Sequence, residues 1–257
     1  MQGDRLGQAE EDKVGAAILA QLLRANLLPG AWIAPAKVRQ HRALLRHRIS
    51  LVGLGTRQRN RIHAVAADHG YDRSAGYRAG PGRGWLAGLD LPATSREIVT
   101  GCLAVIDGLA PVIDRIDGEL HARAKADPRV KVLATLPGVG EFTALVMLAQ
   151  IGDIARFGSA RKLASRAGLT PAVRGPDLTV RHGHIPEQGS AWLRRALNQA
   201  AQTARRSPDF AAAYAAFARR RGNKIATIAI ARKLLTRAWH LLSELEAADA
   251  GTPPRRS

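Results

Sequence analysis

The sequence is poor in cysteine and in long apolar runs, and each shortage excludes a class of protein. The single cysteine, Cys102, cannot form an internal disulfide, so a disulfide-stapled scaffold is excluded. Its apolar neighbours Leu103, Val105 and Ile106 predict a buried structural thiol. No apolar run approaches the roughly 20 residues that span a bilayer, and the first residues do not resemble a secretory leader. We therefore expect a cytoplasmic protein with no membrane partner.

Acidic and aromatic residues are also scarce. The 21 Asp and Glu residues stand against 39 Lys and Arg, which gives a net charge of +18 and predicts a polyanionic partner. Aromatic residues make up 4% of the chain and are scattered, which argues against a platform that stacks single-stranded bases. Double-stranded DNA, contacted through its phosphate backbone, is therefore the expected partner.

Alanine, leucine and arginine dominate, and alternating β-branched residues are nearly absent, so we expect a mainly α fold. The predicted architecture is a long antiparallel helical hairpin followed by a compact helical domain with a helix-hairpin-helix motif. The hairpin helices could instead pack in a bundle core or form a dimerisation arm. Helices are expected over 12–25, 36–69, 94–127, 192–204 and 210–245. A loop is expected over 70–88, and an ordered loop or a short hairpin over 168–189.

Two details refine this reading. Thr94 and Glu97 form a candidate capping box at the start of the second long helix. Trp239 falls on the apolar face of the last helix, which predicts a packing role.

The segment Leu136-Pro-Gly-Val-Gly140 predicts the helix-hairpin-helix turn. One helix would end at Pro137, the two glycines would allow a tight reversal, and a second helix would begin at Gly140. The free N–H groups of that second helix suit a phosphate. The expected DNA contacts in this turn are Gly138, Val139, Gly140 and Thr143. The alternative is a plain helix–helix connection.

Basic residues gather further along the chain and favour a DNA-facing surface, although a solvated face would explain any one group. The candidate DNA contacts are Arg174, Arg181, His182, His184, Arg194, Arg195, Arg219, Arg220, Arg221 and Lys224. His182 and His184 do not predict a zinc site, because no cysteine lies near them.

Six blocks follow one another in an order that resembles a known family. They are Leu136–Gly140, Ile151–Phe157, Ala167–Pro171, Val180–Ile185, Gln188–Arg194 and Ala218–Gly222. They are similar to the C-terminal domain of the DEDD-type insertion-sequence transposases of the IS110 family, and the preceding arm is similar to the family's connecting coiled coil. The resemblance divides the chain into a remnant of an RNase H-like domain (1–30), the arm (36–127), the C-terminal transposase domain (128–245) and a disordered tail (246–257).

What the family implies is a recombinase that cuts and joins double-stranded DNA as a homo-oligomer, guided to its target by a structured non-coding RNA. Intact members hold Mg²⁺ with Asp-Glu-Asp-Asp carboxylates, which suit a hard divalent cation, and a serine attacks the phosphodiester.

The sequence departs from this family at its expected catalytic residues. The family's first Asp and Glu have no counterpart, Asp12 matches the third acid, and Gly15 stands where the fourth is expected. One carboxylate cannot hold a two-metal site, so we expect no functional Mg²⁺ here. A lone aspartate such as Asp12 is more often a helix N-cap or a solvated acid.

The nucleophile is also replaced. Pro176 stands where the serine is expected and has no hydroxyl, which leaves Ser190 and Thr179 as candidates, with Ser190 also suited to cap a helix. Nearby, Pro186 and Glu187 replace a Ser-Lys pair and put an anion beside the expected DNA path. We therefore expect a DNA-binding transposase in a truncated, catalytically impaired copy. The alternatives are a non-enzymatic helix-hairpin-helix protein that binds DNA or RNA, and an oligomerisation remnant.

Overall fold

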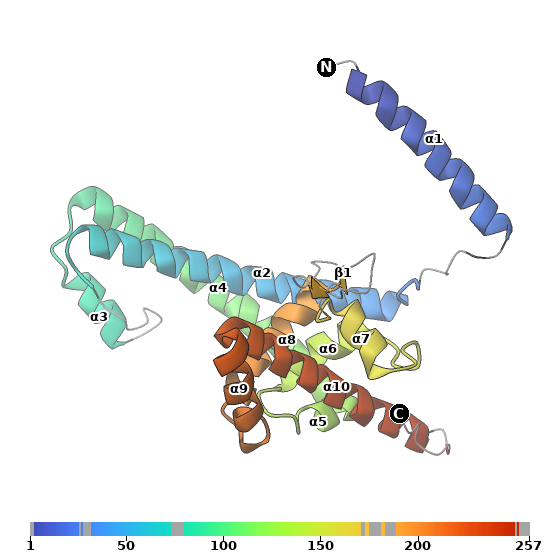
Figure 1. Cartoon of the computed structure of the whole chain (residues 1–257). Helices are drawn as coiled ribbons and strands as arrows, with labels where there is room; N and C mark the ends of the chain where they lie inside the picture. The colour runs from blue at the N-terminus through green and yellow to red at the C-terminus, as the bar shows by residue number, and fades with distance from the viewer. Residues whose placement is uncertain are drawn as a thin grey trace. The chain divides into compact units, whose positions relative to one another are not determined.

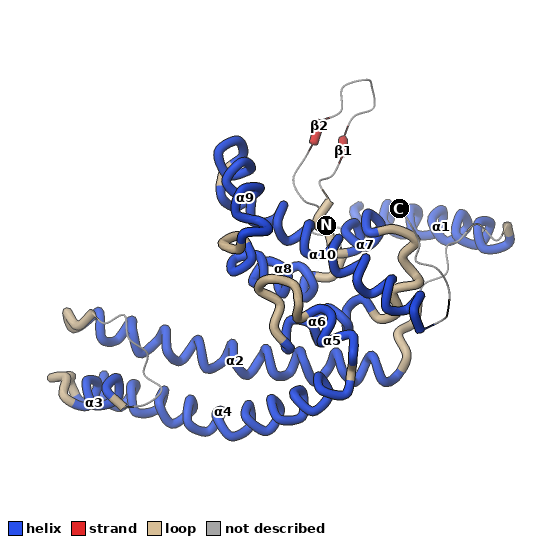
Figure 2. The backbone as a smooth tube through the Cα atoms, turned by 90° about the horizontal axis from the view of Figure 1, so that it is seen from below, coloured by secondary structure: helices blue, strands red, loops and turns tan. Residues whose placement is uncertain are grey.

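The computed structural model describes residues 3–25, 27, 32–72, 80–170, 173–174, 181–182, 189–249 and 251, and for 3–13 and the four strand residues it describes the backbone. The mainly α prediction is confirmed (Figures 1 and 2). The chain divides into two units, residues 1–35 and 36–257, which are described separately below. No helix in the described part of the chain is long and apolar enough to cross a membrane.

The first unit holds one helix, α1 (Gly3–Arg24). It begins nine residues before the predicted start, so Asp12 lies inside the helix and the prediction that it is the N-cap is wrong. The predicted apolar face is present but open to solvent, since Ile18, Leu19 and Leu23 are all more than half exposed.

The second unit begins with the predicted antiparallel arm, formed by α2 (Ala36–Asp68) and α4 (Ala93–Ala126). The two helices run side by side in both views (Figures 1 and 2). Two local predictions fail here. The expected loop contains a short helix, α3 (Pro81–Ala87), and α4 starts without a capping box, because its N-cap is Pro92 and no side chain caps it.

A compact bundle of helices follows the arm. It contains α5 (Pro128–Leu133), α6 (Glu141–Ile151), α7 (Ala160–Arg166), α8 (Ala191–Ala204), α9 (Pro208–Arg221) and α10 (Asn223–Asp249). Between α7 and α8, β1 (Val173–Arg174) pairs antiparallel with β2 (Arg181–His182), which confirms the short hairpin.

The single helix expected over 210–245 is wrong in one respect, because it is broken at Gly222. That glycine has φ 82°, a conformation that side-chain-bearing residues rarely adopt, and it separates α9 from α10. The helix α10 also continues to Asp249, so its last residues belong to a helix and not to the predicted tail.

Two separate hydrophobic clusters hold the second unit together. The larger one fills the bundle and includes Trp239, whose indole Nε1 donates to the carbonyl oxygen of Phe157 at 3.0 Å. The predicted packing role of Trp239 is thereby confirmed. The smaller cluster lies along the arm away from the bundle and includes Ile62, Leu86 and Cys102, which is buried as expected.

We predict that these two clusters unfold at different free energies. The variant Ile62→Ala empties a fully buried site and should lower the stability of the arm by about 2–5 kcal/mol. Hydrogen exchange should then show lost protection around α3 and the adjoining parts of α2 and α4, with the bundle unchanged. The surface variant Val105→Ala serves as control, and equal loss of protection in arm and bundle would contradict the prediction.

Candidate nucleic-acid interface

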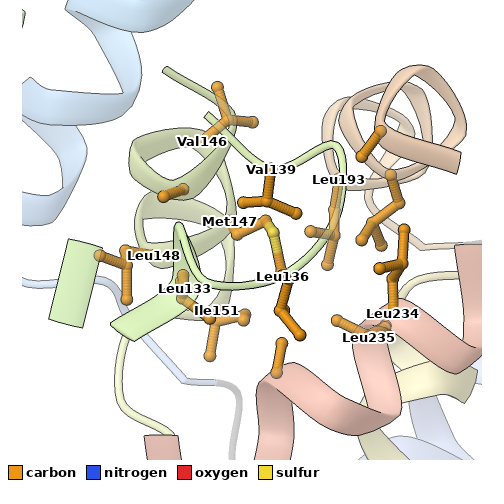
Figure 3. Close-up of a cluster of buried hydrophobic side chains, with 14 of the residues drawn as sticks. Leu133, Leu136, Val139, Val146, Met147, Leu148, Ile151, Leu193, Leu234 and Leu235 are labelled. Atoms are coloured by element: carbon orange, nitrogen blue, oxygen red, sulfur yellow. The ribbon is translucent and has the colours of Figure 1, made fainter. Parts of the chain in front are cut away.

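The turn between α5 and α6 is built by apolar side chains that point inward. Leu136 and Val139 are buried, and in Figure 3 they lie in the same cluster as Met147 and Leu193. The backbone N–H of Val139 donates to the carbonyl oxygen of Leu136 at 3.0 Å. The side chain and the N–H of Val139 are therefore both engaged in packing the turn, which differs from the phosphate contact expected of this residue.

Gly138 brings the turn into direct contact with α8. Its φ is 77°, and a Cβ added there would lie 2.3 Å from the carbonyl oxygen of Ala200 and 3.1 Å from the backbone nitrogen of Ala204. Only glycine permits both the conformation and the close approach. The first helix ends at Leu133 and not at Pro137, because residues 134–140 are needed to make this contact.

Gly140 has a different surrounding from Gly138. It is exposed, its φ is −90°, and no atom lies within 4 Å of an added Cβ. It is the N-cap of α6 without a side-chain cap, and Thr143 is half-buried in the following turn. Glu141 also stands in that first turn, where its carboxylate Oε2 lies 2.7 Å from His121 Nδ1. A phosphate at this helix start would therefore meet a carboxylate as well as free N–H groups.

The strands β1 and β2 bring two of the predicted basic residues together. The register pairs Arg174 with Arg181 and Val173 with His182. Pro176, Thr179 and His184 lie outside the described residues.

Ser190 is the N-cap of α8, so the capping alternative is confirmed. Its Oγ accepts from the backbone N–H of Leu193 at 3.3 Å and donates to the side-chain oxygen of Gln150 at 2.9 Å. Gly189 fixes the approach to this cap, since its φ is 100° and an added Cβ would lie 2.3 Å from the carbonyl oxygen of Arg166.

Beside this cap lies a group of four arginines from distant parts of the chain, which we call the arginine cluster: Arg42, Arg46, Arg156 and Arg166. Burial, followed by the charges of Arg46, Arg156 and Arg166, lowers the pKa of Arg42. Burial and Arg166 likewise lower the pKa of Arg156, although Asp153 acts in the opposite direction. The positive charges therefore repel one another, and an anion bound between them would relieve that repulsion.

Two members of the arginine cluster are held by the end of α6. The guanidinium of Arg42 donates from Nε to the carbonyl oxygen of Ala149 at 2.6 Å and from Nη2 to that of Gln150 at 3.2 Å. Arg156 donates from Nη1 to the carbonyl oxygen of Ile151 at 3.2 Å. Arg46 and Arg166 are exposed, and Arg46 lies over the ring of Trp192 at 5.6 Å. These two are thus the members most open to a ligand.

The cluster could not be predicted from the sequence because its members are far apart along the chain, with 124 positions between Arg42 and Arg166. Arg156 lies within the family-like block 151–157, which was the one available signal.

The predicted basic residues of the C-terminal helices are distributed over two places. On α8, Arg195 is exposed, whereas Arg194 is half-buried and donates to the carbonyl oxygen of Ala167 at 3.3 Å. At the corner between α9 and α10, all four predicted cations are exposed, namely Arg219, Arg220, Arg221 and Lys224. Their exposure is compatible with either DNA contact or solvation.

The described residues do not supply a donor set for the Mg²⁺ that the family resemblance implies. Among the residues whose side chains are described, no three His, Cys, Asp or Glu come together in a way that could hold a metal ion. The side chain of Asp12 is outside that part of the structure, and Gly15 has no carboxylate to offer.

Comparison with known proteins places the bundle in a defined context. Residues 130–215 match the model of the Transposase IS116/IS110/IS902 family. The chain is 30% identical over 251 residues to a putative transposase of Sinorhizobium fredii, covering 91% of this chain and 64% of that protein. It is 37% identical over 82 residues to an uncharacterized 43.6 kDa protein of insertion element IS110 from Streptomyces coelicolor, covering 32% and 20%.

A pilin gene-inverting protein of Moraxella bovis is also similar, at 36% identity over 138 residues, which cover 51% of this chain and 42% of that protein. The chain therefore spans less than two thirds of the length of each of these relatives.

The contrast between the two glycines of the turn gives a prediction. Gly138→Ala should destabilise the protein by about 3 kcal/mol or more, because it combines a strained φ with a clash against α8. Gly140→Ala, at an open position with ordinary φ, should cost less than about 1.5 kcal/mol. Chemical unfolding of the two variants measures the difference. Equal destabilisation would show that the contact with α8 does not control the turn.

Proposed function

Because the chain belongs to the Transposase IS116/IS110/IS902 family, we propose that it binds double-stranded DNA in the transposition of an insertion sequence. The observation that carries this proposal is the arginine cluster, in which the end of α6 holds Arg42 and Arg156 while Arg46 and Arg166 are exposed. Burial, and after it the charges of the neighbouring arginines, lowers the pKa of Arg42. Phosphate groups of a duplex are the ligand that such a site would attract.

Three further groups of basic residues are candidates for the DNA path in this proposal. The paired strands bring in Arg174 and Arg181, the start of α8 adds Arg195, and the α9–α10 corner adds the four cations named above. In this proposal the turn at Gly138 positions α6 and α8, while Gly140 and Thr143 are its nearest candidates for backbone contact. From the family resemblance we also propose that the chain acts as a homo-oligomer and that a structured non-coding RNA guides it to its target.

We also propose that this chain binds DNA without cutting it. Pro176 has no hydroxyl where the nucleophile is expected, and Gly15 has no carboxylate where the fourth acid is expected. The hydroxyl of Ser190 donates a hydrogen bond to Gln150 and accepts one from the backbone N–H of Leu193. It is therefore already used in joining α6 to α8. The second candidate function, non-enzymatic DNA or RNA binding, uses the same surface and differs in having no part in the transposition of an insertion sequence.

The DNA-binding proposal is tested by neutralising the two exposed members of the cluster. Arg46→Gln/Arg166→Gln should weaken duplex binding and reduce the slope of log affinity against log salt by about 1.8, because two phosphate contacts are lost. Arg42 and Arg156 are left intact because they support α6. Fluorescence anisotropy over a salt series gives both quantities.

The matched control is Arg161→Gln/Lys162→Gln, which removes the same charge from exposed positions on α7. Its slope should stay close to that of the unaltered chain. If both pairs behave alike, only overall charge attracts DNA. If the unaltered chain binds duplex without salt dependence, the proposed function is wrong.

The catalytic part of the proposal predicts no covalent protein–DNA adduct when the chain is incubated with Mg²⁺ and the ends of its element. A denaturing gel with labelled DNA detects such an adduct. An adduct would refute the proposal, and Ser190→Asn would then test Ser190 directly, since asparagine keeps an N-cap and lacks the hydroxyl.

A further inference from the structure

The two helices of the arm differ sharply in charge. The sequence of α2 contains eight Lys and Arg and one Asp, which gives +7, whereas α4 contains four Lys and Arg and five Asp and Glu, which gives −1. Two packed helices of similar length that served only to separate domains would not need this asymmetry. The excess charge on α2 therefore requires its own explanation.

The exposed arginines of α2 lie along one face. Arg39, Arg46, Arg57 and Arg61 are all exposed, and we call them the arginine stripe. They are separated by seven, eleven and four residues, intervals close to whole turns of a helix with 3.6 residues per turn. The stripe extends over 22 residues, or about 33 Å at a rise of 1.5 Å per residue.

The acids of α4 do not neutralise the distal part of the stripe. Asp117 binds Arg48 through two hydrogen bonds of 2.8 and 2.9 Å, Asp107 binds Arg83 of α3, and Glu119 binds Arg123 within α4. The side chains of Arg57 and Arg61 form no ion pair or hydrogen bond with any residue in the described ranges. Their charges face solvent.

We infer that the arginine stripe is a second DNA-binding surface, which contacts the phosphate backbone of the duplex beyond the arginine cluster. This inference rests on the proposed function, because Arg46 belongs to both groups and continues one surface into the other. A stripe of about 33 Å matches one turn of a DNA duplex, which is about 34 Å long. The arm thus adds phosphate contacts that carry no sequence information.

A second copy of the chain is the competing partner for this face. Its α4 would have to provide the complementary charge, but that helix has a net charge of only −1, and three of its acids are already paired. Nucleic acid needs no such complement, so the charges favour it.

The test compares two double variants of the full chain that remove equal charge from the arm. Arg57→Gln/Arg61→Gln neutralises the distal stripe, and Arg115→Gln/Lys125→Gln neutralises two exposed cations of α4. Glutamine is nearly as good a helix former as arginine, so both variants should fold.

For the stripe variant we expect duplex DNA affinity to fall about tenfold or more in low salt and the slope of log affinity against log salt to fall by about 1.8. The α4 variant should change affinity by less than about twofold.

The outcomes separate the inference from the proposed function. If Arg46→Gln/Arg166→Gln weakens binding while the stripe variant behaves like the α4 variant, the inference alone is overturned. If the unaltered chain shows no salt-dependent duplex binding, both fail. An effect on an RNA duplex alone, or a change in oligomeric state measured by light scattering with DNA affinity unchanged, also overturns the inference.

Discussion

The C-terminal end of α6 is the point on which the arrangement of the second unit depends. Its last carbonyl groups accept hydrogen bonds from Arg42 of the arm and from Arg156 of the following loop, and Gln150 accepts from Ser190 at the start of α8. Helix ends leave such carbonyls without partners inside the helix and carry partial negative charge. The guanidinium groups of Arg42 and Arg156 supply both hydrogen bonds and positive charge, and they join the arm and the loop to the end of α6, while Ser190 joins α8 to it.

This structural role also explains why positive charge accumulates there. The helix end accepts hydrogen bonds from Arg42 and Arg156, and Arg46 and Arg166 add positive charge without a hydrogen bond to a carbonyl group in the described part of the chain. Burial, and after it the charges of the other three arginines, lowers the pKa of Arg42, so the charged form of this side chain is disfavoured at this position. A surface that is electrostatically unfavourable when empty and favourable beside phosphate is typical of a nucleic-acid site.

Much of the fold follows from local patterns in the sequence. The two arm helices are predictable from apolar residues at three- and four-residue steps, and α8 from its cap at Ser190. The break at Gly222 was missed because a single glycine within a helical pattern is usually tolerated, and only its positive φ shows that the helix stops there. The absence of a cap on α4 reflects Pro92, which already fixes the backbone at the helix start.

The candidate site was less predictable because it depends on tertiary contacts. Val139 and Gly138 were expected to face DNA, yet packing against α8 turns the side chain of Val139 and the α-carbon of Gly138 toward the protein. Conversely, Arg42 and Arg166 carry no local signal, and their significance appears only when α2 and α7 are placed around the end of α6. The sequence shows that the chain is basic, but the tertiary structure determines which arginine side chains lie close together.

Binding and chemistry are separable in this architecture, and that separation bears on the proposed function. The contacts that build the arginine cluster involve carbonyls of α6, the cap at Ser190 and the close approach at Gly189, none of which needs a carboxylate cluster or a free nucleophile. Pro176, which stands where the family resemblance expects the serine nucleophile, is not among the residues that make these contacts. Under the proposed function, a chain of this family would lose its chemistry and keep its DNA-binding surface, because the two depend on different residues.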